Sequence, residues 1–257
     1  MVGRPRDSTP RRAPRNASSR PKKPNKPTNA TPAAADAIAN RLAERWPGVA
    51  VELDYRNPYQ LLVATILAAQ STDKIINTLT PAVFARYPDP ASLAKAKPSE
   101  LEQLVFKSGF YRNKSKALIG MARAVVEHHG GSVPDTMEGL CGLPGVARKT
   151  ANVVLGNAFG RNEGIVVDTH VTRVSARLGL TNQTEPVKIE QELTQLVPRR
   201  RWTEFANQMI HHGRYVCRAK DPQCETCPLA PLCPSAGLGA VKAKPSKPAK
   251  RRAKARA

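Results

Sequence analysis

The chain has 257 residues, enough for a buried core and one or two domains, and it carries a formal charge of +21 at pH 7. No apolar run is long enough to cross a membrane, and the start lacks the apolar segment of a secretory signal, which excludes membrane and secreted classes. We therefore expect an intracellular protein. Import into an organelle is an alternative, because the Arg- and Ser-rich start resembles a transit peptide in composition, although its prolines disfavour an amphipathic helix.

Most of the charge lies at the two ends of the chain. Residues 1–32 contain nine Lys/Arg against Asp7, and residues 239–257 contain eight with no acid, so the ends carry +16 of the +21. Both ends are rich in Pro, Ala, Lys and Arg, and we expect them to be disordered. Such tails either keep a chain soluble or bind a polyanion. Clustered Lys and Arg favour nucleic acid, which they bind without sequence preference.

Apolar residues recur at helical spacing between the tails, and strand patterns are nearly absent. We therefore predict an all-α fold whose helices pack as a globule rather than as a bundle. A short extended piece over residues 49–53 precedes the most apolar helix, 59–70, which we expect at the centre of the core. The predicted helices are residues 35–46, 59–70, 99–107, 113–129, 148–159, 169–178, 186–197 and 202–212, the last ending at Gly213.

Two stretches between the helices carry polar or aromatic side chains. The helix over 59–70 ends in the polar run Gln70-Ser71-Thr72-Asp73, in which Ser71 or Thr72 can cap the next helix. Gly109 closes the helix over 99–107, and Phe110 and Tyr111 follow in a predicted loop. Aromatic residues in loops most often join the edge of the core.

A helix-hairpin-helix is predicted within the stretch Leu140–His170. Asp135 and Glu138 form a capping box for a short helix that ends in a Pro-Gly turn, and the helix over 148–159 follows. This arrangement leaves the first amides of the second helix unpaired at the positive end of its dipole, which suits a phosphate. Gly145 in the turn allows backbone and ligand to approach closely.

Lys149 and Asp168 are the candidate reactive groups near this hairpin. Lys149 lies in the first turn of the second helix, where the dipole disfavours the ammonium form, and a neutral amine there can act as a nucleophile. A solvated lysine is the ordinary alternative. Asp168 follows the apolar run 165–167 and begins the helix over 169–178, either as a plain N-cap or as a carboxylate aimed at a fixed place.

Four of the five cysteines lie close together near the end of the chain. Cys217, Cys224, Cys227 and Cys233 have the spacing C-x6-C-x2-C-x5-C. Disulfides are rare inside cells, and four neighbouring thiolates suit a soft metal. Spacing alone leaves zinc and an iron–sulfur cluster open. We expect Cys141, the fifth, to be a small core residue.

The motif LPGVARKTANVVL followed by VDTH, together with the cysteine pattern, resembles the endonuclease III family of helix-hairpin-helix DNA glycosylase/AP lyases. The resemblance covers roughly residues 33–238. It implies two lobes, a six-helix barrel over residues 51–161 and an iron–sulfur lobe made of residues 33–50 and 162–238. One residue departs from the pattern, because Ala147 stands where the family's hairpin usually has glycine.

The resemblance also implies the chemistry. Lys149 would be the nucleophile and Asp168 the essential carboxylate of an enzyme that removes oxidised pyrimidines from duplex DNA and cuts the strand by β-elimination through a Schiff base. The four clustered cysteines would hold a [4Fe–4S] cluster with a structural and binding role. We expect a monomer acting on damaged double-stranded DNA in the cytoplasm of a bacterium, associated with the nucleoid.

Further residues would contact DNA by the same resemblance. Phe110 would be the wedge that holds the base stack apart, with Tyr111 left to the core, and Gln70 would fill the gap left by the flipped nucleotide. The amides of Gly145 and Ala147 would bind phosphate. His170 would either contact DNA or make a local hydrogen bond near the start of its helix.

Alternative functions stay open at this point. Related glycosylases remove pyrimidine dimers, mismatched thymine or mismatched adenine, and the adenine-specific class is disfavoured because it lacks the lysine after the hairpin. A non-catalytic iron–sulfur DNA-binding protein is the alternative from another class, and it is disfavoured by the presence of both Lys149 and Asp168.

Overall fold

The computed structural model describes residues 30–237, and within this range it is all-helical, without a β-strand, as predicted. The basic tails, apart from residues 30–32, lie outside the described residues. No helix between residues 30 and 237 has both the length and the apolar character needed to cross a membrane. The α-helices are α1 (Pro32–Arg45), α2 (Pro58–Ala68), α3 (Asp73–Arg86), α4 (Pro90–Ala94), α5 (Pro98–Val105), α6 (Tyr111–His129), α7 (Met137–Cys141), α8 (Arg148–Phe159), α9 (Thr169–Leu178), α10 (Pro186–Leu196) and α11 (Trp202–Tyr215).

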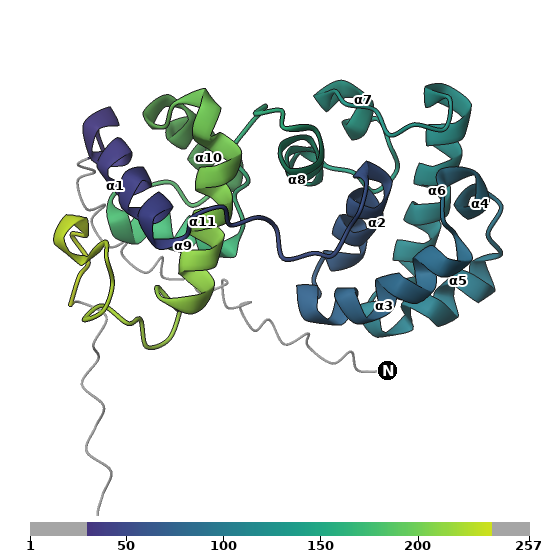
Figure 1. The fold of residues 1–257 in the computed structure, drawn as a ribbon, viewed down its shortest axis with the longest axis horizontal. Coiled ribbons are helices and arrows are strands. Elements are labelled where there is room, and N and C mark those ends of the chain that lie inside the picture. Colours follow the sequence, from purple (N-terminus) through teal and green to yellow (C-terminus); the bar gives the residue numbers. More distant parts are fainter. Residues whose placement is uncertain (1–29, 238–257) are drawn as a thin grey trace, which may run out of the picture.

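The helices form two groups that lie next to each other along the long axis of the molecule (Figure 1). One group contains α2 to α8, in which α4 and α5 pack on α6, and α2 packs on α3 and α8. The other contains α1, α9, α10 and α11, with α11 packed between α1 and α9. The chain passes between the groups after α1 and again between α8 and α9, and α8 also contacts α11.

Helix α2 lies in the core, as its sequence predicts. Asn57 caps its start by accepting a hydrogen bond from the Gln60 amide at 2.9 Å, and Pro58 occupies the first turn. Burying one large aliphatic side chain stabilises a fold by about 1.5–3 kcal/mol, so this helix contributes strongly to the core. Its buried residues are Tyr59, Leu61, Leu62, Val63, Ala64, Ile66 and Leu67.

The predicted capping box before α7 is wrong. Thr136 is the N-cap, and its side chain accepts a hydrogen bond from the Gly139 amide at 3.1 Å. Asp135 instead forms an ion pair with Arg161. The expectation of a core position for Cys141 is also wrong, because this residue is exposed at the last position of α7, where its thiol lies 3.6 Å from the Met137 sulfur.

The predicted end of α11 at Gly213 is wrong as well, since the helix continues to Tyr215. Gly213 is buried against α9, and a Cβ atom there would lie 2.8 Å from the Cβ of His170. The glycine therefore permits close packing of two helices instead of ending one. Helix α4 was not predicted, and it begins with a capping box formed by Asp89 and Ser92.

Candidate functional site

The hairpin between α7 and α8 has the tight turn that its sequence predicts. Gly145 has φ +79°, and a Cβ there would lie 2.8 Å from the Cβ of Ala117 on α6, so the turn has no room for a side chain. Ala147 is the exposed N-cap of α8 and offers no side-chain hydrogen bond. The first amides of α8 are therefore not capped by Ala147, and they combine with the helix dipole into a site suited to an anion.

Lys149 is exposed in the first turn of α8, directly after Arg148. The guanidinium of Arg148 donates to the carboxylate of Glu190 on α10, from Nε at 3.1 Å and from Nη2 at 2.9 Å, and these bonds raise the pKa of Arg148. Glu190 is buried and also accepts from the Asn152 amide at 3.1 Å. This pair ties the start of α8 to the other helix group.

The sequence alone did not predict the Arg148–Glu190 pair. A glutamate at a buried position of an otherwise ordinary amphipathic helix is the signal that could have pointed to it, because buried charges need a partner. Gly164 makes room for the carboxylate, since a Cβ there would lie 2.0 Å from Glu190 Oε1.

Asp168 is half-buried and caps α9, directly after the buried apolar run 165–167. Its Oδ1 accepts hydrogen bonds from the amides of His170 at 2.8 Å and Val171 at 2.9 Å. No hydrogen bond to Oδ2 comes from residues 30–237, so the carboxylate is held through Oδ1 alone.

His170 has a local partner. Arg173 Nη2 lies 3.2 Å from its Nδ1, and the same guanidinium donates to the carbonyl oxygens of Gly213 at 2.8 Å and Cys217 at 3.1 Å. Because a guanidinium can only donate, Nδ1 accepts and Nε2 of a neutral ring carries the proton. The imidazole ring of His170 therefore makes a local hydrogen bond, which was one of the two predicted roles. The other role, a contact with DNA, stays a prediction.

Gln70 and Phe110 share an uncommon backbone conformation. Their φ angles are +55° and +48°, and with Asp221 they are the non-glycine residues of the described chain that have positive φ. Both are exposed, Phe110 to 65%. Residues other than glycine rarely adopt this region and pay for it in strain, and such positions cluster at functional sites.

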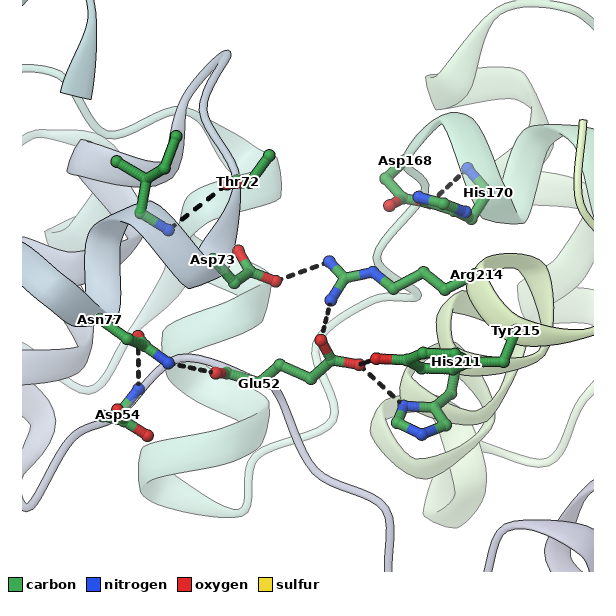
Figure 2. A network of polar contacts seen from close by, with 11 residues as sticks. Glu52, Asp54, Thr72, Asp73, Asn77, Asp168, His170, His211, Arg214 and Tyr215 are labelled. Atoms are coloured by element: carbon green, nitrogen blue, oxygen red, sulfur yellow. Dashed lines mark hydrogen bonds and ion pairs between the residues drawn. The ribbon is translucent and has the colours of Figure 1, made fainter. Parts of the chain in front are cut away.

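A polar network joins the two helix groups close to Asp168 (Figure 2). Arg214 on α11 donates to Glu52 Oε2 and to Asp73 Oδ2, both at 2.6 Å. Glu52 Oε1 also accepts from the Tyr215 hydroxyl at 3.0 Å and lies 3.1 Å from His211 Nδ1. The bond to Glu52 raises the pKa of Tyr215, and burial lowers that of His211.

This network fixes the start of α3 relative to α11. Asp73 is the first residue of α3, and Thr72 caps that helix as predicted, with its side chain accepting from the Ile75 amide at 3.4 Å. Arg214 therefore neutralises two carboxylates between the helix groups.

All four clustered cysteines line one cavity of about 260 Å³. Within residues 30–237 no three His, Cys, Asp or Glu side chains are placed to hold a single metal ion together. Arg177 Nη1 donates a hydrogen bond to Cys217 Sγ at 3.2 Å, and burial raises the pKa of the Cys227 and Cys233 thiols. Four thiol groups around one cavity suit a soft metal centre.

Comparison with known proteins identifies the family. Residues 63–199 match the HhH-GPD superfamily of base excision DNA repair proteins. Endonuclease III of Synechocystis sp. is 53% identical over 189 residues, which are 74% of this chain and 86% of that relative. This chain belongs to the endonuclease III family. Endonuclease III of Bacillus subtilis is 40% identical over 191 residues, 74% of this chain and 87% of the relative.

Solved structures of this family have the same fold. A trapped endonuclease III–DNA covalent intermediate with an estranged adenine is 38% identical and covers 80% of this chain and 97% of its own, with a TM-score of 0.76. The predicted family and all-α fold class are thus confirmed. The chain is a DNA glycosylase and AP lyase of base excision repair.

Proposed function

We propose that this glycosylase/AP lyase acts as a monomer on damaged double-stranded DNA, removes oxidised pyrimidines and cuts the strand by β-elimination. The observation that carries the proposal is the exposed Lys149, in the first turn of the helix that follows the hairpin. It is supported by the likeness to an endonuclease III that was trapped as a covalent intermediate with DNA.

In the proposed reaction, neutral Lys149 attacks the anomeric carbon of the damaged nucleotide. A C–N bond forms between Nζ and this carbon, the glycosidic bond breaks, and the base leaves with a proton that balances the one lost by the attacking amine. Asp168 stabilises the positive charge that develops on the sugar and assists proton transfer through Oδ2, while its Oδ1 keeps its two backbone partners. The C1′–O4′ bond then breaks as the C=N bond of the sugar–lysine Schiff base forms, and O4′ takes up a proton. Removal of a C2′ proton from this Schiff base expels the 3′ phosphate by β-elimination.

The proposed DNA contacts surround these groups. Phe110 enters the base stack and Gln70 fills the space of the flipped nucleotide, which their exposure supports. The amides of Gly145 and Ala147 bind a phosphate at the uncapped start of α8. His170 contacts DNA next to Asp168.

We further propose that Cys217, Cys224, Cys227 and Cys233 hold a [4Fe–4S] cluster, and the cavity that they line supports this assignment. When bound, the cluster would join four chain positions by covalent bonds and so stabilise the segment after α11. The proposed setting is the bacterial cytoplasm, on nucleoid DNA. We also propose that the chain divides into two lobes. One is a six-helix barrel over residues 51–161, and the other consists of residues 33–50 and 162–238.

A panel of lesions tests the substrate class. Single-turnover excision is measured on duplexes with thymine glycol, a pyrimidine dimer, a thymine mismatch or an adenine mismatch, with Lys149→Ala as the inactive control. We expect thymine glycol to react fastest and Lys149→Ala to cut none of the duplexes. A faster reaction on any other duplex would show that oxidised pyrimidines are not the preferred substrate. A protein that binds DNA but excises no base would contradict the proposed glycosylase activity.

A further inference from the structure

Lys114 is a buried lysine that none of the proposed roles uses. Its side chain is 6% exposed, and Nζ donates to two backbone carbonyl oxygens, Leu67 O at 2.8 Å and Ser108 O at 2.7 Å. Burial lowers the pKa of this amine. Placing an ammonium group here is costly, and hydrogen bonds to both carbonyls offset that cost.

The two carbonyl groups belong to the segments that carry Gln70 and Phe110. Leu67 lies in the last turn of α2, whose final carbonyls have no partner inside the helix, and Gln70 follows shortly after. Ser108 is the last residue of a 3-10 turn that ends just before Phe110. The Lys114 side chain therefore links the backbone that precedes Gln70 to the backbone that precedes Phe110.

The hydrogen bonds of Lys114 hold backbone next to two residues in an unfavourable conformation. Gln70 and Phe110 both have positive φ, and residues in such conformations keep them only where the surroundings hold them. The amide of Lys114 also donates to the carbonyl of Phe110 at 3.1 Å. Lys114 thus contacts the Phe110 segment through both its side chain and its backbone.

We infer that Lys114 is a positioning residue, which holds Gln70 and Phe110 in the arrangement that enters the base stack. This role rests on the proposed DNA contacts of those two residues. Positioning should matter most when an intact base has to be unstacked, because flipping costs least at a site where stacking is already lost. Loss of Lys114 should therefore impair base excision more than cleavage at an abasic site.

The test compares Lys114→Met with Lys116→Met. Lys116 is exposed on the same helix, so its replacement removes the same charge without touching either carbonyl. In single-turnover assays we expect Lys114→Met to lower excision of thymine glycol about tenfold or more and cleavage of an abasic duplex less than about threefold. Lys116→Met should leave both rates near those of the wild type.

A combination of substitutions separates positioning from a general loss of structure. If Lys114 acts through Gln70 and Phe110, adding Lys114→Met to a protein that already carries Gln70→Ala and Phe110→Ala should change excision little, whereas independent effects would multiply. A rate loss that is equal on both duplexes, or that multiplies in this combined variant, would overturn the inference. If Lys114→Met does not fold, Lys114→Gln replaces it in the same comparison, since its amide can still donate to one carbonyl.

Amide hydrogen exchange in the free protein tests the tie without activity. We expect Lys114→Met to speed exchange in residues 69–72 and 108–112, and Lys116→Met to leave both segments unchanged. Unchanged exchange in Lys114→Met would refute the tie. A wild-type protein that excises no base would refute the proposed function instead, and the exchange comparison would still decide whether Lys114 holds the two segments.

Discussion

Asp168 combines two roles that a single residue type can satisfy together. Its Oδ1 caps α9 through two amides, and its charge is proposed to act on the sugar. The N-cap was predictable from the sequence, because an aspartate after a buried apolar run and before a helical pattern is a standard helix start. The close packing of Gly213 on His170 was not, since the contact depends on how α9 and α11 lie in space.

Two substitutions at Asp168 separate the cap from the charge. Asp168→Asn keeps a side-chain oxygen for the cap, so we expect nearly wild-type stability in urea but about 100-fold or more slower excision. Asp168→Ala should lose activity similarly and also cost about 1 kcal/mol of unfolding free energy. An active Asp168→Asn would show that the residue serves only the helix.

At the scale of elements, most helices could be located from sequence periodicity. Helix α8 spans Arg148–Phe159, and α9 spans Thr169–Leu178, both as predicted. The contacts between the helix groups could not be predicted from the sequence, because Glu52 and Asp73 are far from Arg214 in the chain and only folding brings them together. Charged residues on amphipathic helices usually face solvent, so nothing local marked this one as an inter-group tie.

Removing Arg214 should weaken that tie. Arg214→Met leaves the carboxylates of Glu52 and Asp73 without their shared partner, and since the group is only partly buried we expect a loss of about 1–2 kcal/mol in unfolding free energy. Arg218→Met is the matched control, because Arg218 pairs at 3.5 Å with the highly exposed Asp221 and should contribute under about 0.5 kcal/mol. Equal losses in urea titrations would contradict a special role for Arg214.

In the whole molecule, the fold belongs to the helical core, and most of the net charge belongs to the two ends of the chain. The helical core between residues 30 and 237 belongs to a known repair family, and its all-α class followed from periodicity and composition. The arrangement in two groups was implied by resemblance alone, because helix lengths and loops do not determine which helices pack together. The net charge, concentrated in the two ends, is a sequence property that bears on DNA affinity.

Deleting residues 1–29 and 238–257 should weaken binding to undamaged duplex, most strongly at low salt. Each phosphate contact that is lost makes the slope of log K against log salt shallower by about 0.9. A full-length variant with the Lys and Arg of both ends changed to Gln should behave like the deletion, since charge and not length is responsible. An unchanged slope in both would refute a role for the basic ends.

Borohydride trapping on a duplex with a single abasic site tests directly whether Lys149 forms the covalent bond to the sugar. Reduction converts a lysine–sugar Schiff base into a stable adduct, whose position in the protein is read by peptide mass spectrometry. We expect one adduct, on Lys149, and none in Lys149→Ala, which should still bind the duplex. An adduct on another residue, or strand cleavage at full rate by Lys149→Ala, would contradict the assignment of Lys149 as the nucleophile.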